Sequence, residues 1–380
     1  MRIVIAGGGT GGHVTPALAT IAALREQRPG QMLDLLWIGT ADGVERRIAQ
    51  EQKIRFATIQ AGKLRRYLSL ENLIDLGRLP VGVVQASFAL RRFRPDIVFG
   101  TGGFVSVPTV AAAGLLRLPI LIHEQTAQFG LANRLNLPFA TTVALPYEAS
   151  RAFVPPTKAR VVVTGNPVRA EISQGNRAEG ARLLGLDPHL PTIYATGGAR
   201  GARAINTTVA TLLPELVQRY QVIHSCGTQD ISPTLAELHE LRNQLPAELR
   251  ERYVVLDFVG GELPHVYALT ALVIGRAGAG TVAELAALGK PAILIPLPGT
   301  GGDEQTKNAR LLADVGGAIM LPEAELTPAR LLSLLTDLLD PASADHLTQM
   351  GVAARTQAPP DAAAELAREL LQLSTQSRQP

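Results

Sequence analysis

The sequence has little cysteine and few aromatic residues. Cys226 is the single cysteine among 380 residues, which excludes an intramolecular disulfide framework and favours a reducing compartment. It follows an apolar run, where a small buried residue is the ordinary expectation. Aromatic residues make up 4% of the chain, so few side chains are available for stacking on single-stranded nucleic acid.

No charge of one sign dominates the sequence. The chain has 36 lysines and arginines against 33 aspartates and glutamates. This balance argues against a general affinity for nucleic acid, although an isoelectric point near 9.2 permits a local basic face. We expect no nucleic-acid partner.

One uncharged segment, from Ile97 to Leu116, is about long enough to cross a bilayer. Glycines and a proline interrupt it, and they predict a strand, a glycine turn and an alanine-rich helix of an α/β core. The N-terminus runs from an apolar strand straight into glycines and is too short for a signal peptide. We therefore expect a cytoplasmic protein.

Apolar strand-like runs alternate with helical stretches along the chain. The expected strands cover residues 2–6, 33–38, 96–99, 120–123, 142–145, 192–196, 220–225, 253–258, 272–274 and 292–295. Such alternation predicts the α/β class, with parallel, doubly wound sheets.

The chain is longer than a single hydrophobic core usually supports, so we expect two domains. Residues 96–103 and 271–278 share a pattern of strand and glycine turn, which indicates two related halves. Glycine and proline near residue 165 place the predicted boundary between domains 1–164 and 165–354. A C-terminal helix at about 355–375 is expected to pack back on the first domain.

Two glycine-rich turns follow expected strands, at residues 7–13 and 197–203. Glycines allow a sharp turn and close approach of a ligand, and the helix N-terminus beyond offers N–H groups to anions. The first turn satisfies the G-x-G-x-x-G pattern of dinucleotide enzymes. The second strand, however, ends at Gly39-Thr40 without the acidic residue that binds the ribose. We expect no dinucleotide cofactor.

His13 follows the first turn, with Pro16 in the first turn of the expected helix. The imidazole either fills space between strand and helix, or acts as a neutral proton acceptor at a helix N-terminus. The sequence leaves both readings open.

Residues 275–284 combine a strand end, a glycine turn and a helix start. The N–H groups of this turn suit a diphosphate, with Arg276 adding charge. Glu284 either completes a capping box with Thr281 or contacts a ribose hydroxyl. In the loop after the next strand, Asp303, Gln305 and Asn308 are either surface polar residues or ligands of a hydroxyl-rich group.

An amphipathic stretch runs from Lys63 to Arg94. It opens and closes with basic residues and has apolar residues between them. Such a helix either packs on the core or rests on an anionic membrane surface.

Several motifs occur together and in order over nearly the whole chain. They are Gly7-Gly8-Gly9-Thr10-Gly11-Gly12-His13, Gly102-Gly103-Phe104-Val105-Ser106, His123-Glu124-Gln125, Gly165-Asn166-Pro167-Val168-Arg169, Gly197-Gly198-Ala199-Arg200-Gly201-Ala202, Arg276-Ala277-Gly278-Ala279 with Thr281 and Glu284, and Asp303 to Ala309. As a set they closely resemble the MurG family, the UDP-N-acetylglucosamine (UDP-GlcNAc) transferases that convert lipid I to lipid II in peptidoglycan synthesis.

The resemblance implies a GT-B glycosyltransferase fold, with two Rossmann-like domains facing a cleft. In this family the C-terminal domain holds the sugar nucleotide and the N-terminal domain holds the lipid-linked acceptor. The transfer is inverting and independent of metals, with no cofactor. Implied partners are UDP-GlcNAc, lipid I, the cytoplasmic face of the membrane and other cell-wall enzymes.

The resemblance also assigns roles to residues. His13 is the catalytic base or a group that positions the acceptor, Arg169 lies near the diphosphate, Glu284 holds the ribose, and Gln305 reads the GlcNAc hydroxyls. The implied donor-binding residues are Thr10, Gly11, Gly12, Arg169, Ala199, Arg200, Gly201, Val259, Arg276, Gly278, Ala279, Thr281, Glu284, Gln305 and Asn308. The implied acceptor-binding residues are Gly102, Gly103, Phe104, His123, Glu124, Gln125, Thr126 and Asn133.

The chain departs from the family pattern at two positions. Thr126 stands where the family usually has asparagine, and Ala199 where it usually has serine. Two alternatives stay open from the sequence: a related transferase that uses another lipid acceptor such as diacylglycerol, and a catalytically silent nucleotide-binding scaffold.

Overall fold

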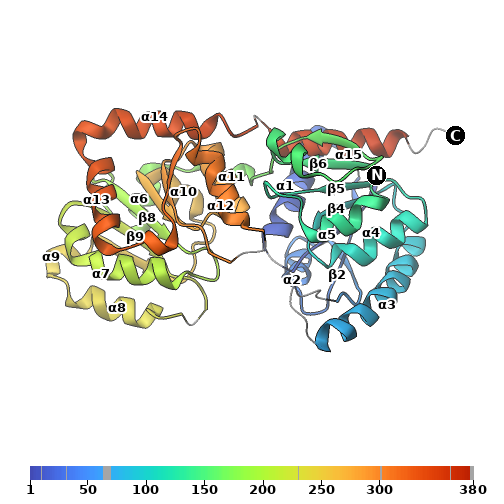
Figure 1. Ribbon diagram of the computed structural model, residues 1–380, viewed down its shortest axis with the longest axis horizontal. Helices are drawn as coiled ribbons and strands as arrows, with labels where there is room; N and C mark the ends of the chain where they lie inside the picture. The colour runs from blue at the N-terminus through green and yellow to red at the C-terminus, as the bar shows by residue number, and fades with distance from the viewer. Residues whose placement is uncertain are drawn as a thin grey trace. The chain divides into compact units, whose positions relative to one another are not determined.

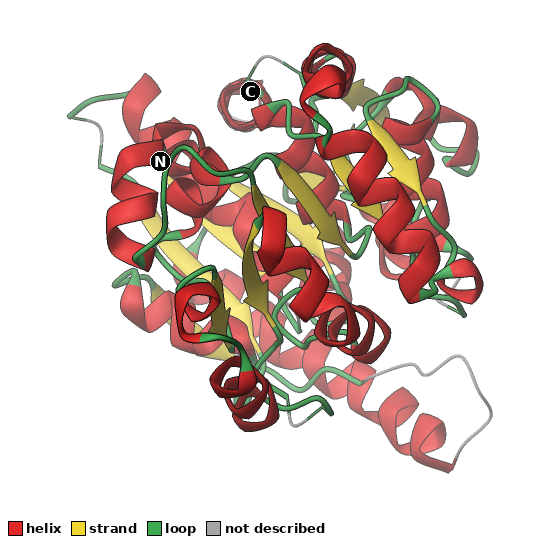
Figure 2. Cartoon of the chain, turned by 90° about the vertical axis from the view of Figure 1, so that its left-hand side faces the viewer, coloured by secondary structure: helices red, strands yellow, loops and turns green. Residues whose placement is uncertain are grey.

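The computed structural model describes residues 1–9, 11–30, 32–62, 70–229, 231–299, 302–359 and 361–376. The chain forms two compact units. Unit 1 comprises Met1–Arg169 together with Pro359–Pro380, and unit 2 comprises Ala170–Ala358. Each unit is built on its own parallel sheet with helices on both faces (Figure 2). The two doubly wound sheets confirm the α/β class predicted from the alternation of strands and helices.

Unit 1 contains a seven-stranded sheet in the order β3-β2-β1-β4-β5-β6-β7. Its strands are β1 (Arg2–Gly7), β2 (Asp34–Gly39), β3 (Arg55–Thr58), β4 (Ile97–Gly102), β5 (Ile120–His123), β6 (Thr142–Leu145) and β7 (Arg160–Val163). Its helices are α1 (Gly11–Gln27), α2 (Val44–Glu51), α3 (Leu70–Phe93), α4 (Ser106–Leu115), α5 (Leu131–Asn136) and α15 (Ala362–Gln376), with short 3-10 turns η1 (Leu137–Phe139) and η2 (Glu148–Phe153).

Unit 2 contains a six-stranded sheet in the order β10-β9-β8-β11-β12-β13. Its strands are β8 (Thr192–Thr196), β9 (Gln221–Ser225), β10 (Tyr253–Leu256), β11 (Leu272–Gly275), β12 (Ala292–Leu294) and β13 (Ala318–Met320). Its helices are α6 (Arg177–Leu184), α7 (Arg203–Arg219), α8 (Leu235–Gln244), α9 (Ala247–Arg250), α10 (Leu263–Leu269), α11 (Ala279–Leu288), α12 (Glu304–Ala313), α13 (Pro328–Leu339) and α14 (Ala344–Arg355), with 3-10 turns η3 (Ala170–Gln174), η4 (Glu323–Glu325) and η5 (Pro341–Ser343).

The strands of unit 1 are apolar on both faces because helices cover both. Along β1, Ile3 and Ile5 pack in one core cluster, whereas Val4 and Ala6 pack in the cluster on the opposite face. This alternation follows from the two-residue period of a strand.

The last helix, α15, belongs to unit 1 although α14 before it belongs to unit 2. Leu366 and Leu370 of α15 are fully buried in the core cluster that also contains Leu24 of α1. Glu369 forms an ion pair with Arg160 of β7. In Figure 1 α15 lies beside the strands of unit 1. Burial of its apolar face therefore joins the two ends of the chain within one unit.

The uncharged segment from Ile97 to Leu116 contains β4, a glycine turn and α4. Gly102 and Gly103 adopt positive φ angles of 94° and 75° in that turn, where a residue with a side chain would be strained. Of the helices within the described ranges, none has the length and apolar character needed to span a membrane.

Candidate active site

Polar side chains of unit 1 gather where parallel strands end and helices begin. His13 lies in the first turn of α1, Thr101 near the end of β4, and His123 at the end of β5. Glu124 and Gln125 follow His123 directly. The sheet therefore brings together residues that are about a hundred positions apart in the chain.

The His13 ring is fixed from several sides. Its Nδ1 lies 3.1 Å from the carbonyl oxygen of Thr101, and the Thr101 hydroxyl donates to the His13 carbonyl at 2.7 Å. The Gln125 amide donates to the same Thr101 carbonyl at 2.7 Å. A Cβ at Gly102 or Gly103 would approach ring atoms to 3.0 or 3.1 Å, so these glycines leave the room that the imidazole occupies.

Two polar groups contact Nδ1 of His13. The Thr101 carbonyl can only accept, so it favours a proton on Nδ1 and a free lone pair on Nε2. The Gln125 amide nitrogen, 3.2 Å from the same Nδ1, can donate only to the other tautomer. Burial lowers the pKa of His13 below 6.5, although the negative charge of Glu124 and the Thr101 carbonyl partly offset this effect. The imidazole is therefore neutral near pH 7, as a proton acceptor must be.

Glu124 is a buried carboxylate that receives many hydrogen bonds. Its Oε1 accepts from the Gln125 and Thr126 backbone N–H groups at 2.9 and 3.1 Å. Its Oε2 accepts from the Gly130 N–H at 2.8 Å and from the Asn133 amide at 3.0 Å. These donors hold the carboxylate in one orientation.

Thr126 takes part in this network despite its departure from the family pattern. Its hydroxyl lies 3.0 Å from Glu124 Oε1 and 2.5 Å from the Gln128 carbonyl. A hydroxyl has one proton, so it donates to one of these oxygens at a time. Thr126 thus contacts the carboxylate through both its backbone and its side chain.

His123 connects the end of β5 to the segment after β7 through a hydrogen bond. Its Nε2 lies 3.0 Å from the Gly165 carbonyl, and complete burial lowers the pKa of His123 to about 4. Asn133 donates to the His123 carbonyl at 3.1 Å. Both side chains are buried, so they shape the network from within the unit. Phe104 and Gly103 are partly exposed beside it.

The first glycine turn contacts a carboxylate that the sequence analysis missed. Glu45 of α2 is fully buried and its Oε2 accepts from the Gly9 N–H at 3.0 Å. Its Oε1 accepts from the Thr40 backbone and hydroxyl at 3.0 and 2.8 Å. A Cβ at Gly8, Gly39 or Gly43 would come within 2.4, 2.7 or 2.0 Å of Glu45 atoms.

Glu45 places an acid near the end of β2, a strand that itself ends at Gly39 without one. The acid comes from the next helix and points inward, where it binds backbone N–H groups of the turn. Glu45 therefore contacts the glycine turn from inside unit 1. The ribose-binding acid of a dinucleotide enzyme, in contrast, contacts the ligand. Gly11 and Gly12 begin α1, and Thr10 lies outside the described residues.

In unit 2, α11 begins at Ala279 with Gly278 as its N-cap. Thr281 and Glu284 therefore lie inside the helix and form no capping box, which removes the capping interpretation of Glu284. Glu284 instead accepts a hydrogen bond from the hydroxyl of Tyr267 on α10 at 3.0 Å. The sequence analysis did not identify Tyr267.

Arg276 and Asn308 stabilise the loops around this helix start. The Arg276 guanidinium donates to the Ile295 and Pro296 carbonyls at 3.1 and 3.3 Å and pairs with Glu323. The buried Asn308 amide donates to the Ala277 carbonyl at 3.2 Å. Both side chains thus have structural partners, where we expected ligand contacts.

Among the remaining expected donor residues of unit 2, Gln305 lies in the first turn of α12 and the others lie on loops. Gln305 accepts from the Leu297 N–H at 3.0 Å. The Ala199 carbonyl accepts from the Thr228 hydroxyl at 3.0 Å, and Arg200 beside it is exposed. Val259 is buried next to the half-exposed Phe258. Gly201 packs against the Cys226 carbonyl, which a Cβ would approach to 2.2 Å.

Arg169, the last residue of the first segment of unit 1, is exposed. Cys226 is buried, and burial raises the pKa of its thiol, in keeping with the structural role expected for it. Within the ranges that the structure describes, no group of three or more His, Cys, Asp or Glu side chains is arranged to bind a metal ion.

Comparisons with known proteins define the class of this chain. Residues 3–145 match the glycosyltransferase family 28 N-terminal domain, and residues 192–366 match the glycosyltransferase family 28 C-terminal domain. The crystal structure of Acinetobacter baumannii MurG superposes with a TM-score of 0.72 at 28% identity, covering 98% of this chain and 99% of that one. These matches, with the two doubly wound sheets, confirm the predicted GT-B class.

Curated relatives give the family within this class. Two of them are named UDP-N-acetylglucosamine–N-acetylmuramyl-(pentapeptide) pyrophosphoryl-undecaprenol N-acetylglucosamine transferase. The one from Halalkalibacterium halodurans is 38% identical over 96% of this chain and 98% of its own length. The one from Bacillus cereus, numbered 2 in that organism, is 39% identical over 89% of this chain and 91% of its own length. The chain belongs to this family of transferases, as its motifs predict.

A structural prediction concerns Glu45. Replacing it by glutamine puts an NH₂ group against the N–H donors of Gly9 or Thr40, so one buried donor loses its acceptor. We expect Glu45→Gln to lower the free energy of unfolding by about 1–3 kcal/mol. Urea denaturation followed by circular dichroism measures the change.

Glu51→Gln is the matched control, because Glu51 lies on the same helix with its side chain 59% exposed. It should change the free energy of unfolding by less than about 0.5 kcal/mol. Equal effects of the two substitutions would contradict the role given to Glu45.

Proposed function

We propose that the chain transfers GlcNAc from UDP-GlcNAc to the 4-hydroxyl of the N-acetylmuramyl group of lipid I, which gives lipid II. The observation that carries the proposal is 38% identity with a transferase named for this reaction, over 96% of this chain and 98% of the relative. A likeness of this extent includes both units and their site loops.

His13 is the base in this proposal. The acceptor oxygen attacks the anomeric carbon from the face opposite UDP, the bond from that carbon to the diphosphate breaks, and the hydroxyl proton passes to Nε2 of His13. The lowered pKa of His13 and the contacts that fix its ring support this role. Gly102, Gly103, Phe104 and the network of His123, Glu124, Gln125, Thr126 and Asn133 hold the acceptor side.

Unit 2 binds the donor in this proposal. The N-terminus of α11, with its Gly278 N-cap, receives the diphosphate, since the N–H groups and the dipole at a helix N-terminus favour an anion. Arg169 adds positive charge there. Glu284 accepts from the ribose hydroxyls, the backbone at Val259 contacts uracil, and Gln305 contacts GlcNAc. Ala199, Arg200 and Gly201 complete the donor site through their turn.

Transfer and its dependence on His13 can be tested together. The wild-type protein, given UDP-GlcNAc and a short-chain lipid I analogue, should yield a product heavier by one GlcNAc residue in mass analysis. His13→Ala should lower kcat by about 10²–10⁴-fold, because the base is lost, and should keep the affinity for UDP-GlcNAc within about twofold of wild type.

The acceptor is the control in that assay. Diacylglycerol in place of the analogue should give no product, and turnover with diacylglycerol alone would overturn the proposed substrate. Absence of turnover with either acceptor, despite binding of UDP-GlcNAc, would instead favour a scaffold. Full activity of His13→Ala would show that His13 is not the base, and it would leave the proposed transfer reaction unaffected.

The pH dependence of the reaction follows from the pKa of His13. Burial lowers this pKa below 6.5, so the neutral, active form persists at pH values where free histidine is already protonated. We expect kcat/KM to be flat around pH 7 and to decline only below pH 6.5, as His13 becomes protonated. The initial rate with subsaturating acceptor, measured from pH 5 to 8, should show this decline. A decline that begins above pH 6.5 would contradict the assignment.

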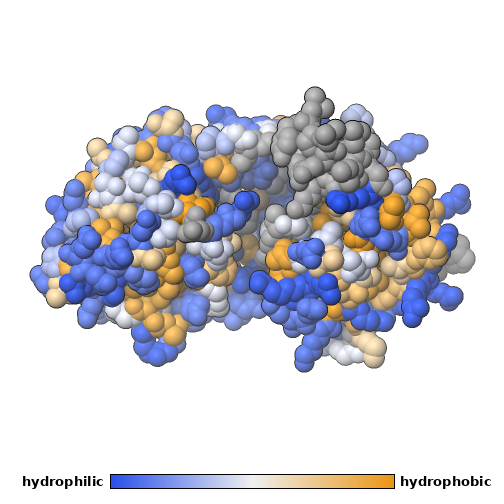
Figure 3. Space-filling view, turned by 90° about the horizontal axis from the view of Figure 1, so that it is seen from below, coloured by the Kyte–Doolittle hydropathy of each residue, from blue (hydrophilic) through white to orange (hydrophobic). Residues whose placement is uncertain are grey.

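We also propose that unit 1 docks on the cytoplasmic face of the membrane through α3. Val81, Val84 and Phe88 recur at helical spacing and are 43%, 55% and 69% exposed. Arg91 and Arg92 continue the same face and are also exposed. Apolar residues followed by basic residues suit an anionic lipid surface. Figure 3 shows apolar and hydrophilic side chains interspersed over the surface of this unit. Residues 63–69, the basic start of the amphipathic stretch, lie outside the described residues.

Vesicle binding tests this docking. The protein should sediment with phosphatidylglycerol vesicles and much less with phosphatidylcholine vesicles. Phe88→Ser should weaken binding to the anionic vesicles several-fold, because an inserted aromatic ring is lost. Val352→Ser on α14 of unit 2, where Val352 is 62% exposed, should bind as wild type does. Equal binding by both variants would contradict docking through α3.

A further inference from the structure

Two buried tyrosines of unit 2 stand next to Glu284. Tyr194 on β8 and Tyr267 on α10 are 4% and 3% exposed. Their rings meet edge to face, with centroids 5.8 Å apart and planes at 86°, which is a favourable aromatic arrangement. The ring of Tyr267 is therefore held by its neighbour, and its hydroxyl has a defined direction.

That hydroxyl is directed at the carboxylate of Glu284. The Tyr267 oxygen donates to Glu284 Oε2 at 3.0 Å, across seventeen positions of sequence. Burial raises the pKa of Tyr194 to about 12, and the negative charge of Glu284 adds to this rise. The carboxylate is thus close to both tyrosines, while Glu284 itself is only partly buried.

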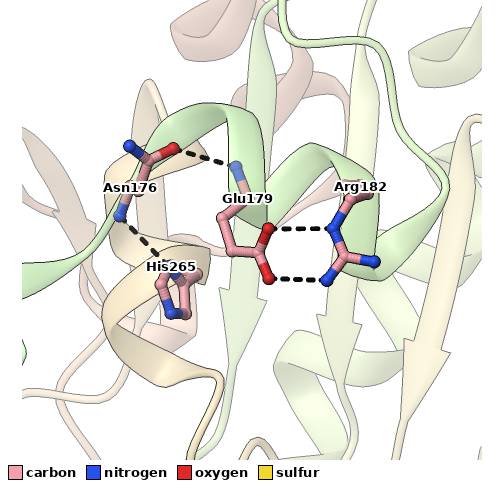
Figure 4. Close-up of polar contacts among 4 residues, drawn as sticks. All are labelled: Asn176, Glu179, Arg182 and His265. Carbon is pink, nitrogen blue, oxygen red and sulfur yellow. Dashed lines mark hydrogen bonds and ion pairs between the residues drawn. The ribbon is translucent and has the colours of Figure 1, made fainter.

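The helix that carries Tyr267 is anchored on its other side. The Asn176 backbone donates to His265 Nδ1 at 3.1 Å, and the Asn176 side chain caps α6 by accepting from the Glu179 N–H at 2.9 Å (Figure 4). Arg182 pairs with the Glu179 carboxylate. These contacts join the start of α6 to α10, two residues before Tyr267.

Glycines let the two segments approach closely. A Cβ at Gly175 would lie 1.9 Å from the Pro264 carbonyl oxygen, and a Cβ at Gly180 would lie 2.5 Å from that of His265. Direct packing of backbone on backbone leaves α10 little freedom to shift. The position of the Tyr267 hydroxyl is therefore set by α6 as well as by Tyr194.

We propose that Tyr267 is a positioning residue that orients the Glu284 carboxylate toward the 2′- and 3′-hydroxyls of the donor ribose. The inference rests on the proposed function, in which Glu284 binds the ribose. A carboxylate has about four lone-pair sites, so it accepts from Tyr267 and from the ribose diol together. Without the tyrosine hydroxyl, the carboxylate loses one of the contacts that fix its direction, and the order lost must be supplied when the nucleotide binds, which weakens affinity.

The test compares two nucleotides on two variants of the full chain. Tyr267→Phe removes only the hydroxyl, and isothermal titration calorimetry measures binding of UDP and of 2′,3′-dideoxyuridine diphosphate. We expect the Kd for UDP to rise about 3–10-fold and the Kd for the dideoxy nucleotide to stay within about twofold. In the transfer assay, KM for UDP-GlcNAc should rise by a similar factor while kcat changes by less than about twofold.

Tyr194→Phe is the matched control, because it removes a hydroxyl from the adjacent buried ring. It should leave the ratio of the two Kd values unchanged. In a Glu284→Ala background, Tyr267→Phe should have no further effect on UDP binding, since the two residues act through one contact.

Three results would overturn the inference. Equal weakening of both nucleotides by Tyr267→Phe would indicate a general structural role. If Tyr267→Phe leaves the Kd values for both nucleotides as they are in the wild-type protein, the positioning role is removed and the proposed function stays intact. Equal affinity of the wild-type protein for both nucleotides would show that no ribose diol is bound, and this would also remove the role of Glu284 in the proposed function.

Discussion

The structure depends on how backbone N–H groups are satisfied where parallel strands turn into helices. These groups are released at the carboxyl edge of each sheet and must find acceptors. In unit 1 the chain supplies its own carboxylates. Glu45 accepts from Gly9 and Thr40, and Glu124 accepts from the residues that follow β5. This edge of unit 1 therefore has two acidic side chains built into it, each held by backbone N–H groups.

Unit 2 uses the same topology with a different charge arrangement. The N-cap of α11 is Gly278, which has no side chain to offer its helix. The carboxylate of Glu284 lies further along that helix and is held by Tyr267, and Arg276 is paired with Glu323 while it fixes the loop after β12. A helix N-terminus of this kind is suited to an anion. Two similar sheets can thus serve different ligands because the acids near their turns differ in position.

Much of the fold follows from the sequence, because buried parallel strands are apolar and glycine punctuates their ends. The strands that the sequence analysis did not include are short: β3 and β7 have four residues each and are partly exposed, and β13 has three residues. Glu45 was missed because an acid in the first turn of a helix is ordinarily a surface residue, and only the three glycines packed around it reveal its burial. In the sequence Tyr267 looks like an ordinary core residue, because its hydrogen-bond partner, Glu284, lies on another helix. The motif resemblance singled out His13, Glu124 and Gln125 as candidates, but that they lie within hydrogen-bonding distance of one another could be seen only in the folded sheet.

The balance of effects on His13 explains why a buried acid is useful beside a base. Burial alone lowers the pKa of the imidazole, and a strongly lowered pKa would make it a poor proton acceptor. The charge of Glu124 and the Thr101 carbonyl act in the opposite direction. In the proposed mechanism, the charge of Glu124 would stabilise the imidazolium that forms when His13 takes the proton, and it would require no reorganisation because backbone donors already hold Glu124 in place. Thr126 donates its N–H to Glu124 and places its hydroxyl against the same carboxylate, so the threonine at this position is part of the network that holds the acid.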